Sequence, residues 1–364
     1  MTKIFFTPGP SQLYLTVAKH LEKGLIENVY SISHRGKQFE QIFAETTANL
    51  KKLLNIPEDY SIFFVSSGTE CMERIIENCV EKYSFHFVNG AFSQRFYETA
   101  IELKKQPLEQ KADLGSGFDF ENVSIPLKTE LICFVHNETS TGVMLNSKKI
   151  ESFKKLFPET LIAVDCVSSM PYVDLNYKAV DLVFFSVQKL LGLPAGLGVL
   201  IVSPNALKKA ESLSKRKINI GTYHNLLSLQ KYASKNQTPE TPSVMHIYLL
   251  EKVLEDMLKI GIKKIRNDTD KKAKLIYDFL DNDPYLSSFV KDEQFRSKTV
   301  IVAKMDQKTE SLIKFLKERG IVVAGGYGAL KDFQIRIANV PANSINNTKL
   351  LIKSLRLYTK QLKP

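Results

Sequence analysis

An aspartate and a lysine follow two apolar runs near the middle of this 364-residue chain. Asp165 comes directly after residues 161–164, and Lys189 comes shortly after residues 182–185. Short apolar runs rich in β-branched and aromatic residues, bounded by polar residues, are typical of buried strands. In an open α/β sheet, ligands bind in the crevice outside the carboxyl ends of the strands. We therefore expect the carboxylate and the amine to face one crevice.

This pair of groups suits pyridoxal 5'-phosphate. A lysine amine can hold the aldehyde of that cofactor as a Schiff base, and a carboxylate can keep its pyridine nitrogen protonated, so that the ring withdraws electrons. Taken singly, Asp165 could as well be a strand-end cap or an ion-pair partner. The prediction that Asp165 and Lys189 are catalytic therefore depends on the two residues occurring together.

A longer motif surrounds the pair. Asp165 lies in V-D-x-V-S-S, and Lys189 lies in S-V-Q-K-x-x-G-x-P-A-G. Together these segments resemble the core of the class V aminotransferases, which have the type I fold of pyridoxal-phosphate-dependent enzymes. The resemblance implies that Ser168 and Gln188 also contact the cofactor.

The flanking segments predict an α/β fold that would position these residues. Further strands are expected at residues 62–65, 85–88, 131–135, 199–202, 299–303, 321–324 and 333–337. Helices are expected at residues 13–26, 37–54, 243–259, 309–319 and 347–362. The resemblance implies a large domain, residues 14–245, with a mainly parallel seven-stranded sheet between helices. It also implies a smaller α/β domain formed by residues 1–13 and 246–364.

A turn at residues 66–70, Ser-Ser-Gly-Thr-Glu, leads from a predicted strand into a helix expected to end near Tyr83. Backbone N–H groups and hydroxyls at such a turn can bind an anion, although a plain helix cap explains the serines equally well. The turn is not a P-loop, because the lysine and the second glycine of that motif are missing. In the family pattern this turn holds the cofactor phosphate, which would assign Gly68 and Thr69 to phosphate binding.

Two further segments match family elements that surround the cofactor ring. Phe92 follows a predicted strand in N-G-x-F-x-x-R, where an aromatic ring could stack on a pyridine ring. The segment His-Asn-Glu-Thr-Ser-Thr-Gly begins at residue 136 and resembles an element whose hydroxyl bonds the ring hydroxyl of the cofactor. We assign that role to Thr139.

The substrate residues are expected in three places. Arg336 lies between apolar neighbours, so its charge needs a buried anion, which could be an internal carboxylate. In the family, the equivalent arginine binds the substrate α-carboxylate as a bidentate fork. His34 and Arg35 come just before a helix, where the helix dipole favours an anion, although they could simply brace the loop. By resemblance, Thr241 reaches the cofactor phosphate of the other subunit, which implies a homodimer with shared active sites.

Composition excludes several other classes of protein. The net charge is +11, but Lys and Arg are spread along the whole chain and no nucleic-acid motif appears. We interpret this as a lysine-rich surface and expect no nucleic-acid partner. No apolar run has the length of a membrane span, and residues 1–13 lack a signal-peptide core, so a cytoplasmic protein is expected. Cys71, Cys79, Cys133 and Cys166 form no C-x-x-C pair, which favours reduced core residues over a disulfide or metal site.

The implied reaction is the transfer of an amino group between amino acids and 2-oxo acids. A cysteine desulfurase is disfavoured, because Gln188 precedes Lys189 and no cysteine follows Cys166. A catalytically silent protein of this fold would have little reason to retain Asp165, Lys189 and Arg336. The motif around His34 and Arg35 favours the phosphoserine branch of the family, with 2-oxoglutarate as acceptor and serine biosynthesis as the pathway. The segment 327–335, with Lys331 as its only cation, resembles the serine or alanine–glyoxylate branch, which remains the alternative.

Overall fold

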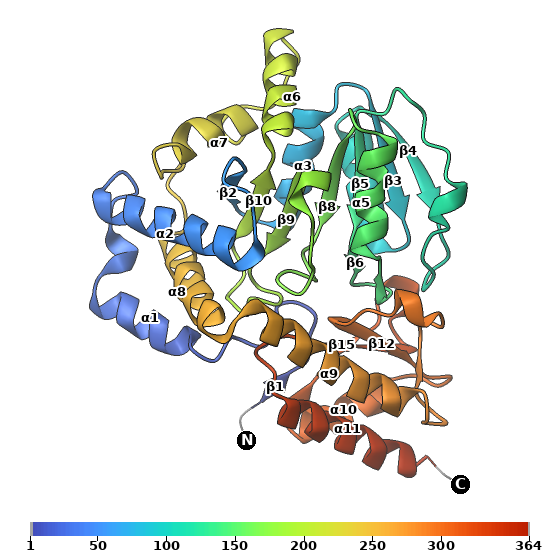
Figure 1. Cartoon of the computed structure of the whole chain (residues 1–364). Coiled ribbons are helices and arrows are strands. Elements are labelled where there is room, and N and C mark those ends of the chain that lie inside the picture. The colour runs from blue at the N-terminus through green and yellow to red at the C-terminus, as the bar shows by residue number, and fades with distance from the viewer. Residues whose placement is uncertain (1–2, 363–364) are drawn as a thin grey trace.

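A mixed sheet of seven strands forms the centre of the larger part of the molecule in this computed structural model, which describes residues 3–362 (Figure 1). The strand order is β2-β10-β9-β8-β5-β3-β4, and β10 alone runs opposite to the other strands of this sheet. The strands are β2 (Ser61–Val65), β3 (Tyr83–Val88), β4 (Gln106–Lys111), β5 (Leu131–Val135), β8 (Leu161–Asp165), β9 (Leu182–Ser186) and β10 (Gly198–Val202). The predicted mainly parallel sheet of type I enzymes is thus confirmed.

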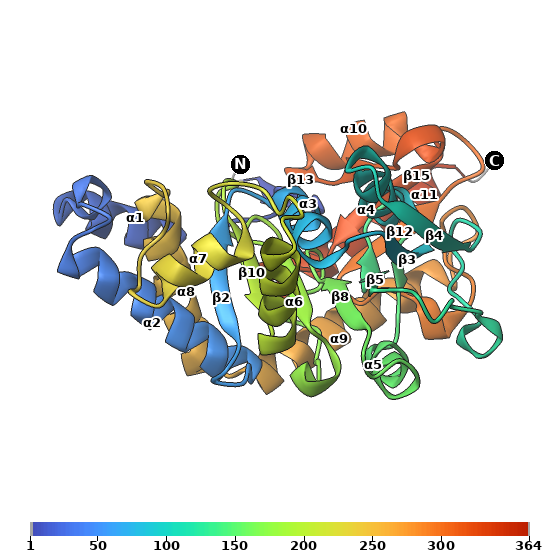
Figure 2. The ribbon, with the colours of Figure 1, turned by 90° about the horizontal axis from the view of Figure 1, so that it is seen from above.

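Helices cover both faces of this sheet, which explains why its inner strands β5, β8, β9 and β10 are apolar and buried, whereas the edge strand β4 is polar and largely exposed. In β9, Phe184 packs with helices on one face and Phe185 with helices on the other, and both side chains are fully buried. The helices are α1 (Val17–Ile26), α2 (Lys37–Leu54), α3 (Gly68–Cys79), α4 (Ala91–Glu102), α5 (Ser147–Leu156), α6 (Pro204–Lys215), α7 (Leu226–Ala233) and α8 (Val244–Ile260). Seen from above, α1, α2, α7 and α8 gather at the β2 end of the sheet (Figure 2).

The C-terminal part has its own sheet, with the order β11-β12-β15-β14. Its elements are α9 (Ile262–Leu280), β11 (Ser287–Ser288), β12 (Val300–Lys304), α10 (Glu310–Glu318), β13 (Ile321–Val322), β14 (Ala324–Gly325), β15 (Gln334–Ala338) and α11 (Ile345–Lys360). The N-terminal strand β1 (Ile4–Phe5) pairs in parallel with β13, with Ile4 opposite Ile321. The N-terminal segment is therefore joined to the C-terminal part.

Most predicted elements are present, with three local differences. The helix expected at 13–26 begins at Val17. Helix α3 ends at Cys79 rather than near Tyr83, because Tyr83 already begins β3 and pairs with Gln106. The strand expected at 321–324 is divided, since β13 pairs with β1 whereas β14 pairs with β15. All four cysteines are buried and unpaired. Within residues 3–362, no helix has both the length and the apolar character required to cross a bilayer.

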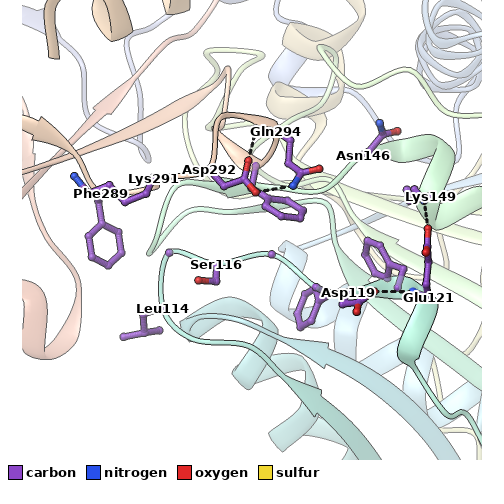
Figure 3. Close-up of a pocket in the computed structure, with 15 residues that line it drawn as sticks. Leu114, Ser116, Asp119, Glu121, Asn146, Lys149, Phe289, Lys291, Asp292 and Gln294 are labelled. Atoms are coloured by element: carbon purple, nitrogen blue, oxygen red, sulfur yellow. Dashed lines mark hydrogen bonds and ion pairs between the residues drawn. The ribbon is translucent and has the colours of Figure 1, made fainter. Parts of the chain in front are cut away.

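The division at residue 245 stays a prediction. Helix α8, which would begin the small domain, contributes Ile247, Leu250 and Leu254 to the same hydrophobic core as Phe39 and Leu50 of α2. A separate contact joins the two parts through the loop after β4, where Gly117 lies against the ring of Phe295. A cavity of about 680 Å³ lies along this contact, and none of the predicted site residues lines it (Figure 3). The chemistry is therefore expected elsewhere.

Candidate active site

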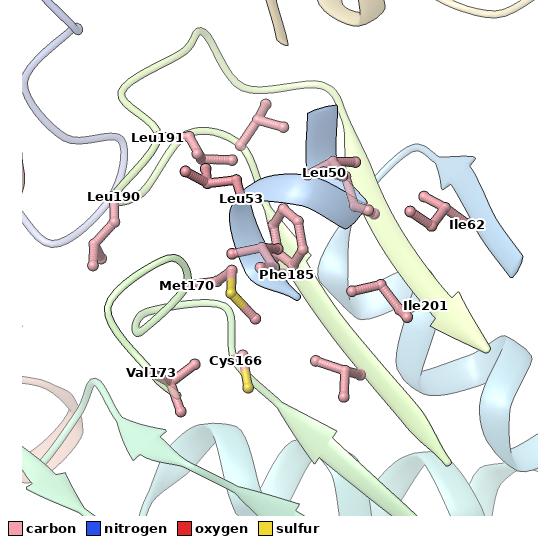
Figure 4. Close-up of a cluster of buried hydrophobic side chains, with 14 of the residues drawn as sticks. Leu50, Leu53, Ile62, Cys166, Met170, Val173, Phe185, Leu190, Leu191 and Ile201 are labelled. Atoms are coloured by element: carbon pink, nitrogen blue, oxygen red, sulfur yellow. The ribbon is translucent and has the colours of Figure 1, made fainter. Parts of the chain in front are cut away.

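Asp165 and Lys189 are brought together by two adjacent parallel strands. Asp165 is the last residue of β8, opposite Phe184 of β9, and Lys189 lies in the loop that follows β9. Leu190 and Leu191, which come directly after the lysine, are buried in the core that also holds Phe185 (Figure 4). The backbone beside Lys189 is therefore fixed by packing, and the predicted placement at the carboxyl ends of the strands is confirmed.

Burial changes the proton affinity of both groups. It raises the pKa of Asp165 to about 7, although the Val167 N–H donates to its Oδ1 at 2.7 Å. Burial, assisted by the charge of Arg336, lowers the pKa of Lys189 to about 8. A cationic ring nitrogen beside Asp165 would favour its ionised form, and an amine with this pKa can act as a base near neutral pH.

A small cavity of about 140 Å³ lies between these two residues and the N-terminus of α3. Every residue predicted to bind the cofactor, except Thr241, lines it: Gly68, Thr69, Phe92, Thr139, Asp165, Ser168, Gln188 and Lys189. The sequence analysis did not assign several other lining residues, namely Ser67, Met72, Val135, Asn137, Val167 and Ser186. Asn137 and Ser186 lie inside the quoted motifs, so their positions in those motifs could have indicated them.

One end of the cavity can accept a phosphate. Helix α3 begins at Gly68, Ser67 caps it, and the Gly68 N–H donates to Ser186 Oγ at 2.9 Å. A Cβ atom on residue 68 would lie 2.7 Å from Cγ2 of Val167, so the close approach of these segments requires glycine. A helix N-terminus with backbone donors and hydroxyls is a favourable site for an anion.

The other end can accept a polar aromatic ring. Gln188 Oε1 and Asn137 Oδ1 are buried and have no hydrogen-bond partner among residues 3–362. Buried polar atoms are normally paired, so two such atoms beside one cavity indicate that a polar ligand completes the site. Asn137 also donates from Nδ2 to Ser168 Oγ at 2.7 Å, which fixes the orientation of both side chains.

Phe92 is held in place by Glu138, a residue that the sequence analysis did not single out. The buried Glu138 carboxylate accepts hydrogen bonds from the Phe92 and Ser93 N–H groups at 3.1 and 2.9 Å, and from Ser140 Oγ at 2.6 Å. A Cβ atom on Gly90 would lie 2.4 Å from Cγ of this glutamate, which explains the glycine. Glu138 thus determines where the Phe92 ring lies in the cavity.

We expect Glu138→Gln to destabilise the fold by about 1–3 kcal/mol, because the glutamine amide would point N–H donors at backbone N–H groups. Urea unfolding measures this loss, and cofactor titration should show weaker binding because Phe92 shifts. Glu130→Gln is the matched control, since Glu130 also accepts from backbone N–H groups, those of Lys82 and Tyr83, away from the cavity. Unchanged cofactor affinity in Glu138→Gln would contradict the positioning role.

A second cavity, of about 670 Å³, shares Phe92, Thr139 and Lys189 with the first. Its other walls come from residues 7–13, and from Tyr327 and Arg336 of the C-terminal part. Arg336 Nε donates to the Gly325 carbonyl at 2.9 Å, and no carboxylate within residues 3–362 forms an ion pair with Arg336. Arg336 thus lies beside Lys189 with its Nη groups available to a ligand.

Three predicted residues lie outside both cavities in a single chain. Arg35 donates to the Thr238 and Pro239 carbonyls at 2.6 and 3.0 Å, and His34 lies next to it in the loop before α2. The Thr241 side chain is exposed. The predicted roles of His34, Arg35 and Thr241 stay predictions.

The sheet, the Asp165–Lys189 pair and the anion-binding turn define a type I pyridoxal-phosphate-dependent enzyme. The family model of the class V aminotransferases matches residues 4–88 and 98–348. The chain therefore belongs to the class V aminotransferases, and it is a transaminase that uses pyridoxal 5'-phosphate.

Individual relatives agree with this assignment. A phosphoserine aminotransferase structure from Cytophaga hutchinsonii is 45% identical, covers 98% of each chain and gives a TM-score of 0.96. The phosphoserine aminotransferase of Rhodococcus opacus is 28% identical over 98% of this chain and 95% of its own length. A pyridoxal-phosphate-bound phosphoserine aminotransferase from Trichomonas vaginalis is 18% identical over 97% of this chain and 99% of its own. Its TM-score of 0.80 shows the shared fold.

The cavity residues fit the cofactor. Gly68 and Thr69 would receive its phosphate, Phe92 would face its ring, and Thr139 or Asn137 would bond its ring hydroxyl. When bound, the cofactor supplies an electron sink that stabilises negative charge at the substrate Cα. In the proposed roles, Asp165 would hold a proton at the ring nitrogen and Arg336 would orient the substrate, while Lys189 Nζ would accept the proton from the substrate Cα and deliver it to the cofactor carbon that carries the amino nitrogen.

Proposed function

We propose that this enzyme transfers the amino group between phosphoserine and 2-oxoglutarate, as a step of serine biosynthesis in the cytoplasm. The observation that carries the proposal is the 45% identity to the Cytophaga hutchinsonii phosphoserine aminotransferase over 98% of both chains. The curated relatives from Rhodococcus opacus and Lactococcus lactis carry the same name.

The second cavity supports a substrate that bears a carboxylate. Arg336 lies at its wall, with the ring of Tyr327 5.4 Å from the guanidinium carbon. The same Tyr327 ring lies 5.7 Å from that of Phe92, so the substrate arginine and the cofactor-facing aromatic are linked. Both phosphoserine and glutamate have an α-carboxylate that a bidentate arginine could bind. The same arginine could therefore bind either amino-acid substrate of the proposed reaction.

We further propose a homodimer in which His34 and Arg35 contribute to the partner's substrate site and Thr241 to its cofactor site. Arg35 is anchored to the 237–239 segment, with its guanidinium carbon 4.7 Å from the Tyr232 ring centre. These bonds bring the His34–Arg35 loop and the loop before α8 into one surface element. The exposed Thr241 side chain lies at the end of that element, where a second chain could meet it.

The experiment that tests the substrate compares kcat/KM for phosphoserine and serine in wild type and in Arg35→Ala. If Arg35 contacts the phosphate, its loss should cost phosphoserine at least ~1.5 kcal/mol of transition-state stabilisation, while serine is nearly unaffected. Because Arg35 also holds the 237–239 segment, Tyr232→Leu serves as the control: it removes the ring under Arg35 and keeps the charge. Equal losses for both substrates in Arg35→Ala would mean that Arg35 is structural.

The serine or alanine–glyoxylate reaction is the second candidate. Its support is the segment 327–335, in which Lys331 is the only cation beside the substrate arginine. A preference for serine or alanine with glyoxylate over phosphoserine with 2-oxoglutarate, measured on the wild-type enzyme, would favour this alternative.

A further inference from the structure

His224 joins two segments that lie far apart in the sequence. Its Nδ1 bonds the carboxylate of Glu70, in the first turn of α3, and its Nε2 donates to Glu240 Oε2 at 2.8 Å. The His224 side chain is only 7% exposed. Since a carboxylate meets each ring nitrogen, both nitrogens must carry a proton, and the ring is an imidazolium. Burial opposes this charge, but the bonds to Glu240 and Glu70 outweigh it and raise the pKa of His224 to about 9.

Glu70 is part of the turn that would receive the cofactor phosphate. Its carboxylate accepts from the Ser66 N–H at 2.7 Å and from Ser66 Oγ at 2.6 Å, and its own N–H donates to Ser67 Oγ at 3.1 Å. Burial raises the pKa of Glu70, yet the bonds from His224 and Ser66 lower it to about 2, so the group is ionised at neutral pH. Glu70 therefore closes the turn from Ser66 to Gly68 while it is held from outside by His224.

Glu240 lies in the loop that carries Thr241. His224 holds this loop through the Glu240 side chain, and Arg35 holds it through the Thr238 and Pro239 carbonyls. Two carboxylates that share one imidazole would repel each other if the ring were neutral or absent. Loss of the imidazolium should thus separate the loop from α3 and release Glu70, which fixes the turn.

We propose that His224 is a positioning residue for the phosphate end of the cofactor site, clamping Glu70 of the phosphate-binding turn to Glu240 of the adjoining loop. The clamp acts on the cofactor phosphate and not on the ring or the substrate. The proposal depends only on the binding of pyridoxal 5'-phosphate at this site. It does not depend on which amino acid is the substrate.

The test titrates cofactor-free protein with pyridoxal 5'-phosphate and with pyridoxal, which lacks the phosphate. Both bind covalently through the same lysine, so the ratio of their dissociation constants isolates the phosphate contribution. We expect His224→Gln to weaken the binding of pyridoxal 5'-phosphate about tenfold, because a charge-assisted contact is lost. The binding of pyridoxal should weaken less than twofold. The control is His20→Gln, which breaks a second histidine–carboxylate pair, to Asp256 at 2.8 Å, on α1 and α8. It should change neither constant.

A pH series separates this clamp from a general loss of packing. The groups that face His224 are Glu70, Glu240 and the ring of Tyr223. Since the carboxylates raise its pKa, the clamp is complete near pH 7 and is lost as the pH rises through about 9. The wild-type preference for pyridoxal 5'-phosphate over pyridoxal should therefore fall between pH 8 and 10, toward the pH-independent value of His224→Gln.

Three results would overturn the proposal. They are an equal loss of affinity for both ligands in His224→Gln, the same loss of affinity in His20→Gln, and an unchanged affinity for pyridoxal 5'-phosphate in His224→Gln. If His224→Gln does not fold, Glu240→Gln replaces it, because that variant removes one arm and keeps the His224–Glu70 contact. A smaller loss confined to pyridoxal 5'-phosphate supports the clamp, and no loss overturns it.

Discussion

Lys189→Ala should lower the amino-transfer rate at least ~10³-fold, because we assign to this side chain both the covalent anchoring of the cofactor and the transfer of the substrate Cα proton. The variant should still bind pyridoxal 5'-phosphate through the other cavity residues, without the absorption band of the lysine-linked form. Stopped-flow half-reactions with the amino donor measure the rate. Borohydride reduction of the wild-type enzyme followed by peptide mapping should place the label on Lys189.

Lys272 provides the matched control for this assignment. It is also a buried lysine whose pKa burial lowers to about 8. Its Nζ, however, donates to the Val340 and Asn343 carbonyls at 2.7 and 2.8 Å and does not line the cofactor cavity. Lys272→Met should reduce stability without removing the cofactor band. Label on Lys272, or on any lysine other than Lys189, would refute the assignment of the catalytic lysine.

Asp165→Asn is expected to retain the cofactor but to slow the reaction at least ~10²-fold, because a neutral amide cannot hold the proton on the ring nitrogen. Although this variant should be slower, its cofactor-free form should not be less stable than the cofactor-free wild type. Since burial raises the pKa of Asp165 to about 7, the carboxylate carries an unfavourable buried charge above that pH. Urea unfolding at pH 8 should therefore find the cofactor-free variant at least as stable as the wild type.

Asp181 is the corresponding control on the same sheet. It is equally buried, but it accepts from the Ile162 N–H, Ser203 Oγ and Lys154 Nζ, each at 3.0 Å, at the opposite end of the strands. Asp181→Asn should lower the free energy of unfolding and leave the turnover of the folded enzyme unchanged. A comparable loss of turnover in both variants would mean that Asp165 acts through the fold and not through the cofactor.

The cofactor site could be predicted from sequence because its residues lie at strand ends and in short local motifs. Asp165 and Lys189 follow apolar runs, and Phe92 and Thr139 follow two more. Glu138 was missed because its position depends on the backbone N–H groups of Phe92 and Ser93, which are 46 and 45 residues away in the sequence.

The substrate cavity is harder to derive, because its walls come from both ends of the chain. The apolar neighbours of Arg336 predicted only a buried anionic partner, and its substrate role came from the family resemblance. Nothing in the sequence indicated that residues 7–13 would line the same cavity. The bonds of Arg35 to the 237–239 segment also join positions about 200 residues apart. Such contacts depend on tertiary packing, which local patterns do not encode.

The pairing of β1 with β13 has a consequence for the order of folding. Gly9 and Ser11 lie directly against the lysine loop: Ser11 Oγ donates to the Lys189 carbonyl at 2.5 Å, and Gly9 packs so closely that a Cβ atom would meet Lys189 Nζ. This segment is anchored by Ile4, whose strand partner is Ile321. Contacts of such large sequence separation form slowly. During synthesis on the ribosome, the early segment must remain unpaired until β13 has emerged, so the enzyme becomes competent only when nearly all of this sequence has been translated.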